Sequence, residues 1–381
     1  MVPTRHRPPL SGSVTRAERP ERRHARHGTV GDVPGEPSSE LVVAVTGPTG
    51  TFGFGLVPLL EADERIARVV GIARRPFDPT EHGWTKMDYR RGDVRDRAEL
   101  ERAFAGADVV VHLAFLVMGT SSPATTRSIN VDGTLNALHA SAAVGARRFV
   151  YASSVAAYGF HRDNPARLTE DWPVRPADHL FYAREKAELE QLLQQAAADH
   201  ADLDLYLLRP SIVLGPHTVG AKDLLPSPLM PLARRLGAVA RRVESLPVPL
   251  PVLAPDVPIQ FVHEDDVGRA LLACIAGAGP PGAYNLAGDG VVTGADVARE
   301  LGLAPVPVPG GVVRSAARAV AALPFLPQVA GWAEAVSQPA IMDTTKAREL
   351  LGWRPRYSGL DALRATLGRR RPPCIGVDRD K

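Results

Sequence analysis

Short apolar runs alternate along this chain with stretches in which apolar residues recur every three or four positions. The apolar runs are rich in β-branched residues and have the length of strands buried on both faces, as in parallel sheets. Those that predict strands are Leu41–Val45, Ala67–Ala73, Ala107–Ala114 and Arg148–Ala152. Helical spacing is found at 54–62, 128–143 and about 179–198. Strands that alternate with helices in this way predict an α/β fold with a doubly wound parallel sheet.

Three glycines, Gly47, Gly50 and Gly53, stand three residues apart directly after the first predicted strand. Residues without a Cβ allow the backbone to turn tightly, a ligand to approach closely, and the next helix to pack against the strand. The first turn of that helix presents unpaired N–H groups and the positive end of its dipole, which together attract phosphate. This arrangement is typical of Rossmann domains that bind dinucleotides.

Two arginines, Arg74 and Arg75, follow the second predicted strand, where no carboxylate stands. In dinucleotide folds an acidic side chain at this position binds the ribose hydroxyls of NAD, whereas arginine accommodates the 2′-phosphate of NADP. These residues favour NADP over NAD; two arginines at a solvated strand end are the alternative. Asp93 in RRGDVRD follows a short third strand, where an aspartate receives the adenine amine or stabilises a turn.

The strand at 148–152 delivers Ser153 and Ser154 at its carboxyl end, where open parallel sheets bind their ligands. Tyr182 and Lys186 lie on a predicted helix, and a spacing of four places the phenol and the ammonium on one face. Lowering a phenol pKa to near neutrality requires about 4 kcal/mol, which a cation about 4–5 Å away supplies at an effective dielectric constant near 20. We therefore expect Lys186 to lower the pKa of Tyr182.

The Tyr-x-x-x-Lys spacing stands out because the chain has only five lysines against 40 arginines. Chance alone would produce about 0.1 such pairs in a chain of this composition. A lysine in so arginine-rich a chain indicates a need that the broad, permanently charged guanidinium does not meet. His112 lies within an apolar strand and is interpreted as a core residue rather than a catalyst.

Several longer motifs resemble those of one enzyme family. They are TGxxGxxG at 46–53, NVxGT at 130–134, YASSVAAYG at 151–159, YxxxK at 182–186, LRPSIVLGP at 208–216 and FVHEDDV at 261–267. As a set they are similar to the motifs of the extended short-chain dehydrogenases/reductases, the NAD-dependent epimerase/dehydratase family, over about residues 40–370. As a set the motifs are highly specific for the family and poorly specific for the substrate.

The resemblance implies roles for individual residues. Ser154 would hydrogen-bond the reacting oxygen, Tyr182 would exchange a proton with it as general acid/base, and Lys186 would bind the nicotinamide ribose and lower the tyrosine pKa. Asn130 would be a structural or a proton-relay residue. The implied cofactor contacts are Gly47, Gly50, Thr51, Phe52, Gly53, Arg74, Arg75, Asp93, Val94, Leu113, Ala114, Tyr182, Lys186, Pro210, Ser211 and Ile212.

Three positions depart from the pattern of the family's sugar-nucleotide enzymes. Val155 and Ala156 stand where dehydratases place an Asp-Glu pair, which argues against 4,6-dehydration. Ile212 replaces an asparagine that helps to hold the substrate in many sugar-nucleotide members, which puts a diphosphosugar in doubt. The RPSIVLGP form resembles reductases of the superfamily that act on less polar ketones and aldehydes.

Two further groups of charged residues have two interpretations each. His263, Asp265 and Asp266 suggest a metal site, but the resemblance implies a structural turn that leads into a helix, and we expect no metal. The arginines at 234, 235, 241 and 242 are suited to clamp a diphosphate or a carboxylate, or else form a solvated face.

Composition excludes several classes of protein. The two cysteines, Cys274 and Cys374, lie far apart in the sequence and do not suggest a disulfide framework. No apolar run reaches the roughly 18 residues of a membrane span, so we expect no membrane partner and a cytoplasmic location. The net charge of +3 reflects an arginine-rich start rather than the folded part, and we expect no nucleic-acid partner.

The domain organisation that we expect has four parts. A disordered Arg/Pro-rich extension covers 1–39, and a dinucleotide-binding Rossmann domain covers 40–216, to which 259–276 returns. A smaller C-terminal substrate lobe comes from 217–258 and 277–368, and includes an apolar, proline-interrupted stretch at 316–335 that suits a lid or a partner surface. A disordered tail follows over 369–381.

The interpretation that follows is an NADP-preferring oxidoreductase that transfers a hydride at a secondary alcohol or carbonyl of a small molecule, with Tyr182 as general acid/base. One alternative is a nucleotide-sugar epimerase, which returns the hydride to the same substrate and keeps NAD tightly bound. Another is a non-catalytic, dinucleotide-binding regulator, which does not need the proton-transfer tyrosine. A homodimer through the helices around 124–145 and 179–198 stays open.

Overall fold

A computed structural model of the chain describes residues 40–117, 122–176, 180–218, 251–308 and 338–368. The expected N-terminal extension and tail, the arginines at 234–242 and the apolar stretch at 316–335 lie outside these ranges. Among the helices within them, none combines the length and the hydrophobicity that a membrane span requires. The cytoplasmic location stays a prediction.

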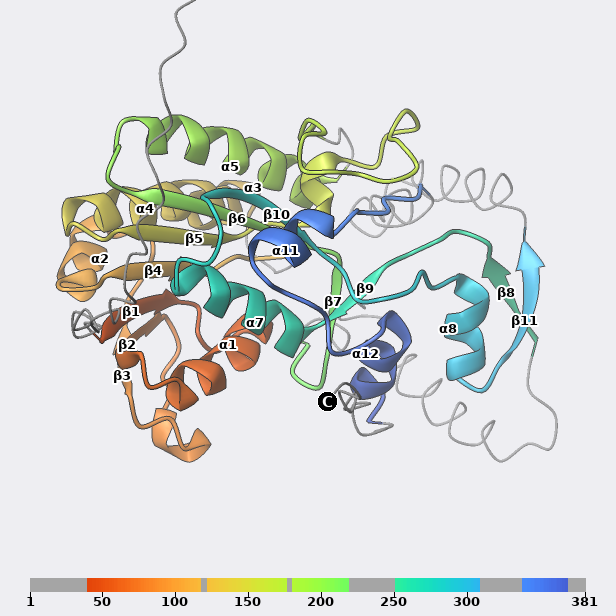
Figure 1. The fold of residues 1–381 in the computed structure, drawn as a ribbon, viewed down its shortest axis with the longest axis horizontal. Helices are drawn as coiled ribbons and strands as arrows, with labels where there is room; N and C mark the ends of the chain where they lie inside the picture. The colour runs from red at the N-terminus through yellow and green to blue at the C-terminus, as the bar shows by residue number, and fades with distance from the viewer. Residues whose placement is uncertain (1–39, 118–121, 177–179, 219–250, 309–337, 369–381) are drawn as a thin grey trace, which may run out of the picture. The chain divides into compact units, whose positions relative to one another are not determined.

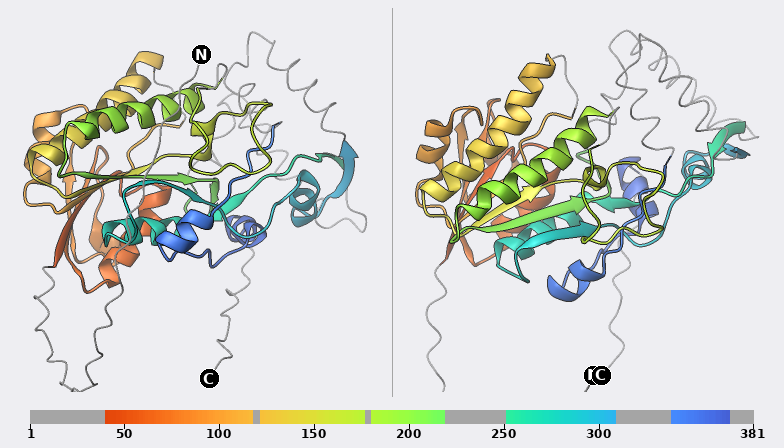
Figure 2. Two further views of the ribbon diagram at one scale, coloured as in Figure 1. Left: turned by 45° about the horizontal axis from the view of Figure 1, so that its top comes forward. Right: turned by 90° about the horizontal axis from the view of Figure 1, so that it is seen from above.

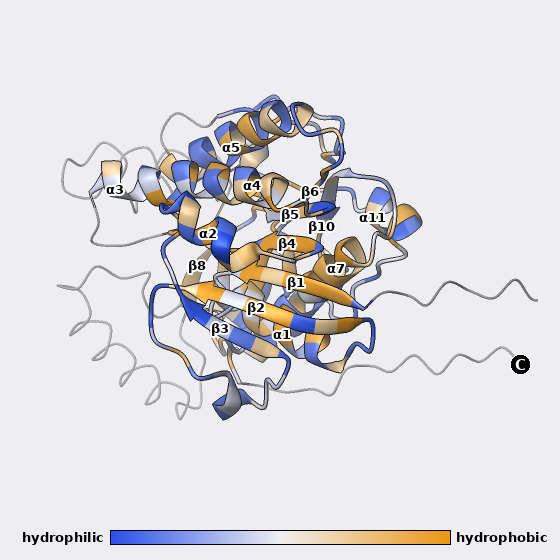
Figure 3. Ribbon diagram, turned by 90° about the vertical axis from the view of Figure 1, so that its left-hand side faces the viewer, coloured by the Kyte–Doolittle hydropathy of each residue, from blue (hydrophilic) through white to orange (hydrophobic). Residues whose placement is uncertain are grey.

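Seven parallel strands form the central sheet, in the order β10-β6-β5-β4-β1-β2-β3. Their bounds are β1 Leu41–Thr46, β2 Ile66–Ala73, β3 Met87–Arg91, β4 Val109–His112, β5 Arg148–Ala152, β6 Asp204–Pro210 and β10 Gly282–Leu286. Apolar residues dominate β1 and β4 at its centre (Figure 3). The strand order reverses at β1, which has β2 on one side and β4 on the other (Figure 1). In open sheets, ligands bind at the carboxyl ends of the strands beside such a reversal.

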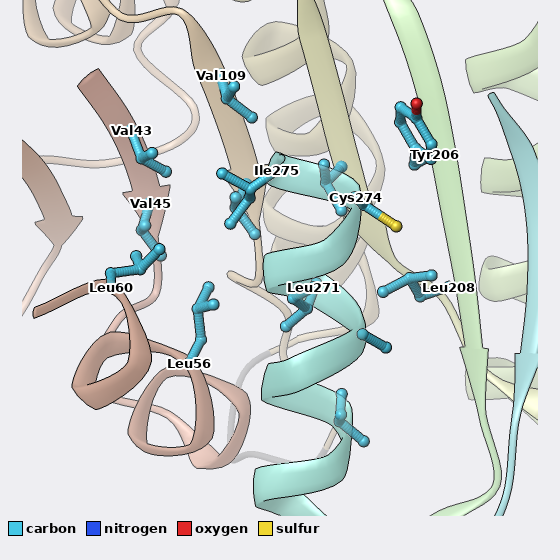
Figure 4. Packing of buried hydrophobic residues seen from close by; sticks show 14 of the residues in the cluster. Val43, Val45, Leu56, Leu60, Val109, Tyr206, Leu208, Leu271, Cys274 and Ile275 are labelled. Carbon is cyan, nitrogen blue, oxygen red and sulfur yellow. The ribbon is translucent and has the colours of Figure 1, made fainter. Parts of the chain in front are cut away.

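Helices cover both faces of the sheet, which confirms the doubly wound arrangement (Figure 2). On one face lie α1 (Thr51–Ala62) and α7 (Glu264–Ile275), and on the other lie α2 (Arg97–Phe104), α4 (Gly133–Ala143) and α5 (Phe181–Ala198). Figure 4 shows how Leu271, Cys274 and Ile275 of α7 pack against the strands. Each face therefore has its own apolar core, and the Cys274 thiol belongs to one of them.

Two glycines allow α1 and α7 to cross in backbone contact. A Cβ on Gly55 would lie 2.3 Å from the carbonyl oxygen of Glu264, and a Cβ on Gly268 would lie 2.0 Å from that of Gly55. Side chains at these positions would separate the two helices. The crossing brings α7, from late in the chain, against the helix that follows the glycine turn.

The remaining elements are short. Two further pairs of parallel strands are β7 (Ile212–Leu214) with β9 (Phe261–His263), and β8 (Pro251–Pro255) with β11 (Ala304–Val308). The other helices are α3 (Pro123–Arg127), α8 (Gly294–Glu300), α11 (Thr345–Leu350) and α12 (Gly359–Thr366). Single turns of other helix types are η1 (Pro79–His82), η2 (Ser128–Asp132) and η3 (Val155–Tyr158).

One predicted domain boundary is wrong. The sequence interpretation assigns everything from residue 277 to the substrate lobe, but Gly282–Leu286 forms β10 and pairs with β6 at the edge of the main sheet. The segment GAYNLAG lacks the β-branched apolar run that predicted strands such as β1 and β4. Its side chains Tyr284 and Leu286 are nevertheless fully buried, because α7 and α11 lie against this edge.

Candidate active site

The turn that contains Gly47, Gly50 and Gly53, here called the glycine turn, brings the ends of β1 and β4 together. Gly47 has a φ of +70°, and a Cβ there would lie 2.9 Å from the backbone nitrogen of Ala114. A Cβ on Gly53 would lie 1.9 Å from the carbonyl oxygen of Pro48. Gly47 is therefore required both for its backbone conformation and for close packing, and Gly53 is required for close packing.

The start of α1 is suited to an anion. Gly50 is its N-cap and offers no side-chain acceptor to the first N–H groups, and the first turn has no acidic residue. The first intrahelical bond runs from the N–H of Phe54 to the carbonyl oxygen of Gly50 at 3.0 Å, so the amides of Phe52 and Gly53 precede the helical ladder. The helix dipole adds positive potential at the same place, where a pyrophosphate fits.

Arg74 and Arg75 are exposed directly after β2. Their backbone is tied to β3, because the carbonyl oxygen of Arg75 accepts from the Tyr89 hydroxyl at 2.5 Å and that of Arg74 accepts from Arg91 Nε at 3.4 Å. The guanidinium of Arg91 thus lies beside Arg74, one of the two arginines that are predicted to bind the 2′-phosphate of NADP. Three arginines, at 74, 75 and 91, therefore gather at this edge of the sheet.

Asp93 follows β3 and is held by Arg95. Its carboxylate accepts from the guanidinium at 2.6 and 3.0 Å, and this hydrogen bonding lowers the pKa of Asp93. Val94 is buried under α4, where a Cβ on Gly133 would lie 2.4 Å from its Cγ2. The segment therefore has an ordered conformation on the sheet edge beside Arg74 and Arg75, although a contact to adenine stays a prediction.

Ser154 and Tyr182 are joined by a side-chain hydrogen bond. Ser154 follows β5 and caps η3, where its oxygen accepts from the N–H of Ala156 at 3.1 Å. Tyr182 lies in the first turn of α5. Burial raises the pKa of the Tyr182 phenol, and the hydrogen bond with Ser154 opposes the rise. The phenol is therefore protonated at neutral pH, in the form that a general acid needs.

Lys186 lies one turn further along α5 and is only 3% exposed. Its ammonium donates to the phenol oxygen of Tyr151 at 2.9 Å and to the carbonyl oxygen of Ala152 at 2.7 Å. The ring of Phe115 covers a third side, with its centroid 3.8 Å from Nζ. Burial lowers the pKa of Lys186 to about 7, although two glutamates of the same helix oppose the change.

The structure contradicts one expectation for this pair. The sequence predicts that Lys186 lowers the pKa of Tyr182, whereas the structure has this pKa raised by burial. Nζ of Lys186 lies 5.9 Å from the centroid of the Tyr182 ring and donates its hydrogen bonds elsewhere. Helical spacing correctly predicted that the two side chains lie near each other, but it could not reveal that Tyr151 and Ala152 compete for the ammonium.

Phe115 connects the glycine turn to this group. It follows Ala114, whose backbone lies against Gly47. Its ring is edge-on to the Tyr182 ring, with centroids 5.6 Å apart, and it also lies over the ammonium of Lys186. Ser154, Tyr182 and Lys186 are called the Ser-Tyr-Lys group below. Since β1, β4 and β5 are neighbours in the sheet, the glycine turn and this group lie at the same edge, at the carboxyl ends of the strands.

Asn130 fixes the loop that holds Phe115. Its amide oxygen accepts from the N–H of Leu116 at 2.7 Å, and its amide nitrogen donates to the Leu116 carbonyl oxygen at 3.0 Å. The same nitrogen donates to Glu185 at 2.8 Å. Asn130 lies in η2, a single π-helical turn, a feature that is frequent at functional sites. These contacts are structural, and a proton relay through Asn130 stays a prediction.

His112 is a core residue, as the sequence predicts. Its Nδ1 pairs with the Thr46 hydroxyl at 2.9 Å and its Nε2 with the Thr134 hydroxyl at 3.1 Å. Thr134 donates its own proton to the carbonyl oxygen of Asn130, so it must accept from Nε2–H, which leaves Nδ1 as the acceptor. Burial lowers the pKa of His112 to about 3, and the ring is therefore neutral.

Ser211 has a buried hydroxyl without a hydrogen-bond partner among the described residues. It follows Pro210 at the end of β6, and Ile212, the next residue, is 39% exposed. A buried hydroxyl without a partner at the carboxyl end of a parallel strand invites a polar ligand. Together with the glycines after β1, this hydroxyl is compatible with the predicted dinucleotide site, and a contact of Pro210, Ser211 or Ile212 with the cofactor stays a prediction.

His263, Asp265 and Asp266 form the start of α7. Nδ1 of His263 accepts from the N–H of Asp265 at 3.1 Å, and its ring stacks on Tyr357 with centroids 4.0 Å apart. Asp266 accepts from the N–H groups of Arg356 and Tyr357. These side chains thus attach the C-terminal segment to α7. In the described part of the chain, no three His, Cys, Asp or Glu side chains are grouped as metal ligands would be.

Sequence reasoning missed Tyr151 and Phe115. A phenol in a buried strand needs a polar partner, and this signal was present in the run RFVYA. It did not identify Lys186, which is 35 residues away. Nothing in the sequence around Phe115 indicates that its ring covers the ammonium of Lys186.

Comparison with known proteins agrees with this geometry. The model of the NAD dependent epimerase/dehydratase family matches residues 43–287. The chain belongs to this family. Among curated relatives, an uncharacterized protein of Mycobacterium tuberculosis is 28% identical over 328 residues, which are 84% of this chain. The match covers only 29% of that protein's length.

Two solved structures share the epimerase/dehydratase fold of this chain. The UDP-glucose 4-epimerase of Thermotoga maritima, solved with UDP-glucose, has a TM-score of 0.64 and 22% identity, with 86% of this chain and 98% of that chain covered. The Bordetella bronchiseptica enzyme WbmG, solved with NAD, has a TM-score of 0.62 and 20% identity, with 88% and 95% covered. At such identities the likeness shows the fold.

Proposed function

We propose that this member of the epimerase/dehydratase family is an NADP-preferring oxidoreductase that interconverts a carbonyl compound and a secondary alcohol. The hydrogen bond between Ser154 and Tyr182, beside the buried Lys186 and the glycine turn, is the observation that supports it most directly. A bound nicotinamide would supply or accept the hydride. The protein's own residues bind the substrate and move the proton.

Tyr182 acts as the general acid when the carbonyl is reduced. Burial keeps its phenol protonated, so the phenol has a proton to donate to the carbonyl oxygen. Ser154 donates a hydrogen bond to the same oxygen and stabilises the negative charge that develops there. Lys186 would donate its third hydrogen, on the side covered by Phe115, to the ribose of a bound nicotinamide nucleotide. In the oxidation the same groups act in reverse.

Arg74 and Arg75 support the preference for NADP. Both are exposed after β2, and no acidic residue follows that strand before Asp78, which instead caps η1. A 2′-phosphate at this edge would meet guanidinium donors, which bind phosphate through paired hydrogen bonds.

The first test is direct. Mass spectrometry of the gently purified protein identifies any dinucleotide that it retains. The protein is then mixed with NADPH or NADH and a panel of ketones and aldehydes, and we expect consumption of NADPH with formation of the alcohol.

Tyr182→Phe should reduce turnover at least about 100-fold. Tyr206→Phe removes a hydroxyl that donates to the Gly279 carbonyl, and it should leave turnover unchanged. Analytical ultracentrifugation of the same preparation would show whether the protein forms a homodimer.

A nucleotide-sugar epimerase with tightly bound NAD is the second candidate. It is favoured by the fold shared with the UDP-glucose 4-epimerase, and disfavoured by Ile212, which replaces a substrate-holding asparagine. Retained NAD, together with conversion of a UDP-sugar and no net use of NADPH, would establish it in place of the reductase. If no substrate turns over and Tyr182→Phe changes nothing, the chain is a dinucleotide-binding regulator.

A further inference from the structure

We propose that Tyr151 is a positioning residue of this site: its phenol oxygen, together with the carbonyl oxygen of Ala152, holds the Lys186 ammonium where a nicotinamide ribose can meet it. This inference rests on the proposed function, because it assumes that a dinucleotide binds beside Lys186. Tyr151 lies in β5, three residues before Ser154, and would touch neither substrate nor cofactor.

The ring of Tyr151 is enclosed in the interior of the protein. The residue is 1% exposed and belongs to the apolar core between the sheet and the helices α4 and α5. Its ring also stacks at 6.1 Å on that of His112 from β4. A phenol held in this way cannot follow the ammonium, so the ammonium must take its position from the phenol.

The three hydrogens of the ammonium have unequal partners. Tyr151 and Ala152, which accept two of them, are 1% and 4% exposed and lie in the strand β5. The third faces the ring of Phe115, which is half-buried and lies in the loop after β4. A ribose hydroxyl that displaces Phe115 would therefore receive the third hydrogen while the other two bonds persist. Lys186 is held in place before the ligand arrives.

The carboxylates near Lys186 have other partners. Glu185 accepts from the amide of Asn130 at 2.8 Å, and Glu190 accepts from the guanidinium of Arg209. Both glutamates lie on α5, the helix of Lys186, and favour its charged form from a distance. Since neither is hydrogen-bonded to Nζ, the direct partners of the ammonium are the two neutral oxygens of β5.

Two other titratable groups face Lys186, and both are neutral. They are His112 of β4, whose pKa burial lowers to about 3, and Tyr182 of α5, whose pKa burial raises. Without the Tyr151 hydroxyl, the buried ammonium would keep one polar acceptor among the described residues, the carbonyl oxygen of Ala152. Hydrogen bonds to charged groups are among the stronger ones in proteins, so the loss should favour the neutral amine.

The test measures binding and needs no substrate. NADPH fluorescence is titrated with the wild type, Tyr151→Phe and Tyr206→Phe between about pH 5 and pH 9. Affinity should fall as pH rises through the titration of Lys186, because a neutral amine donates more weakly to the ribose. In Tyr151→Phe the midpoint of this fall should lie about one pH unit lower. Tyr206 is an equally buried tyrosine on β6, and its variant should keep the wild-type midpoint.

An unchanged midpoint in a folded Tyr151→Phe would overturn the proposal and leave Tyr151 a packing residue. If that variant does not fold, Tyr151→Phe combined with Lys186→Met should fold, since the ammonium that lost its partner is removed as well. Failure of the double variant, when Lys186→Met alone folds, would also overturn it. If the midpoint shifts in Tyr151→Phe but the wild type turns over no substrate of the panel, the proposed oxidoreductase function is refuted, and the positioning role of Tyr151 is supported.

Discussion

The guanidinium of Arg209 and the carboxylate of Glu190 form an ion pair that is shielded from water. Nη2 lies 2.5 Å from Oε2, and the two side chains are 4% and 0% exposed. Nε of Arg209 donates to both carboxylate oxygens, at 3.0 and 3.1 Å. The Ser153 hydroxyl donates to the same carboxylate at 2.5 Å. The pair thus joins α5 and β6 to the turn after β5, beside the Ser-Tyr-Lys group.

Arg209→Leu should destabilise the protein by about 3–5 kcal/mol, because it leaves the buried carboxylate of Glu190 without its countercharge. Burial by itself would lower the pKa of Arg209, but the pairing with Glu190 outweighs it and raises this pKa. Combining the change with Glu190→Leu should recover part of the loss. Denaturant unfolding of the three variants measures these differences. A single variant within about 1 kcal/mol of the wild type would contradict the prediction.

Lys186 should make stability depend on pH. Burial lowers its folded pKa to about 7, from 10.5 in the unfolded chain. Between these values the unfolded chain binds a proton that the folded chain has released. The free energy of unfolding should therefore rise with pH in this window, by up to about 1.4 kcal/mol per pH unit from this group. Below about pH 7 the contribution should be flat.

Lys186→Met isolates this contribution, because the other titrating groups are retained. Urea unfolding at several pH values from about 6 to 10 should show the stability of the wild type rising relative to the variant. A difference between the two proteins that stays constant across this range would show that Lys186 keeps an ordinary pKa.

Gly55→Ala should destabilise the protein by about 1–3 kcal/mol or more, because the new methyl group would lie 2.3 Å from the backbone oxygen of Glu264. Gly50→Ala is the matched control for stability. Its Cβ would meet nothing closer than 3.5 Å, and its φ of −92° suits alanine. Thermal unfolding compares the two variants. Equal stability would mean that α1 and α7 can separate without cost.

Arg74→Ala and Arg75→Ala test the cofactor preference. Each should weaken NADPH binding about tenfold, since each removes a charged donor to the 2′-phosphate, and should leave NADH binding unchanged. Arg68→Ala is the control, because Arg68 is exposed on the same strand but away from its carboxyl end. Fluorescence titration with both dinucleotides measures the ratio. Equal losses for NADPH and NADH would show that these arginines do not distinguish the two.

Local sequence patterns predicted five of the seven strands of the main sheet, missed β6 and β10, and placed some strand ends wrongly. The strand at Arg148–Ala152 has the predicted bounds. Ala107–Ala114 was predicted too long, because pairing with β1 ends at His112 and the next two residues turn against Gly47. Residues 282–286 were missed as a strand of the main sheet, since their burial depends on helices from elsewhere in the chain.

The spacing of glycines and the four-residue step from Tyr182 to Lys186 were properties of the amino-acid sequence, because turns and helix faces depend on neighbouring residues. They were enough to predict the sheet class, and together with the longer motifs they indicated the family, whereas the roles of the site residues stay predictions. The partner of Lys186, the buried pair of Arg209 and Glu190, and the pKa of Tyr182 emerged only from the assembled fold. They depend on side chains that are far apart in sequence, and on burial, which exists only once the sheet and its helices have closed around them.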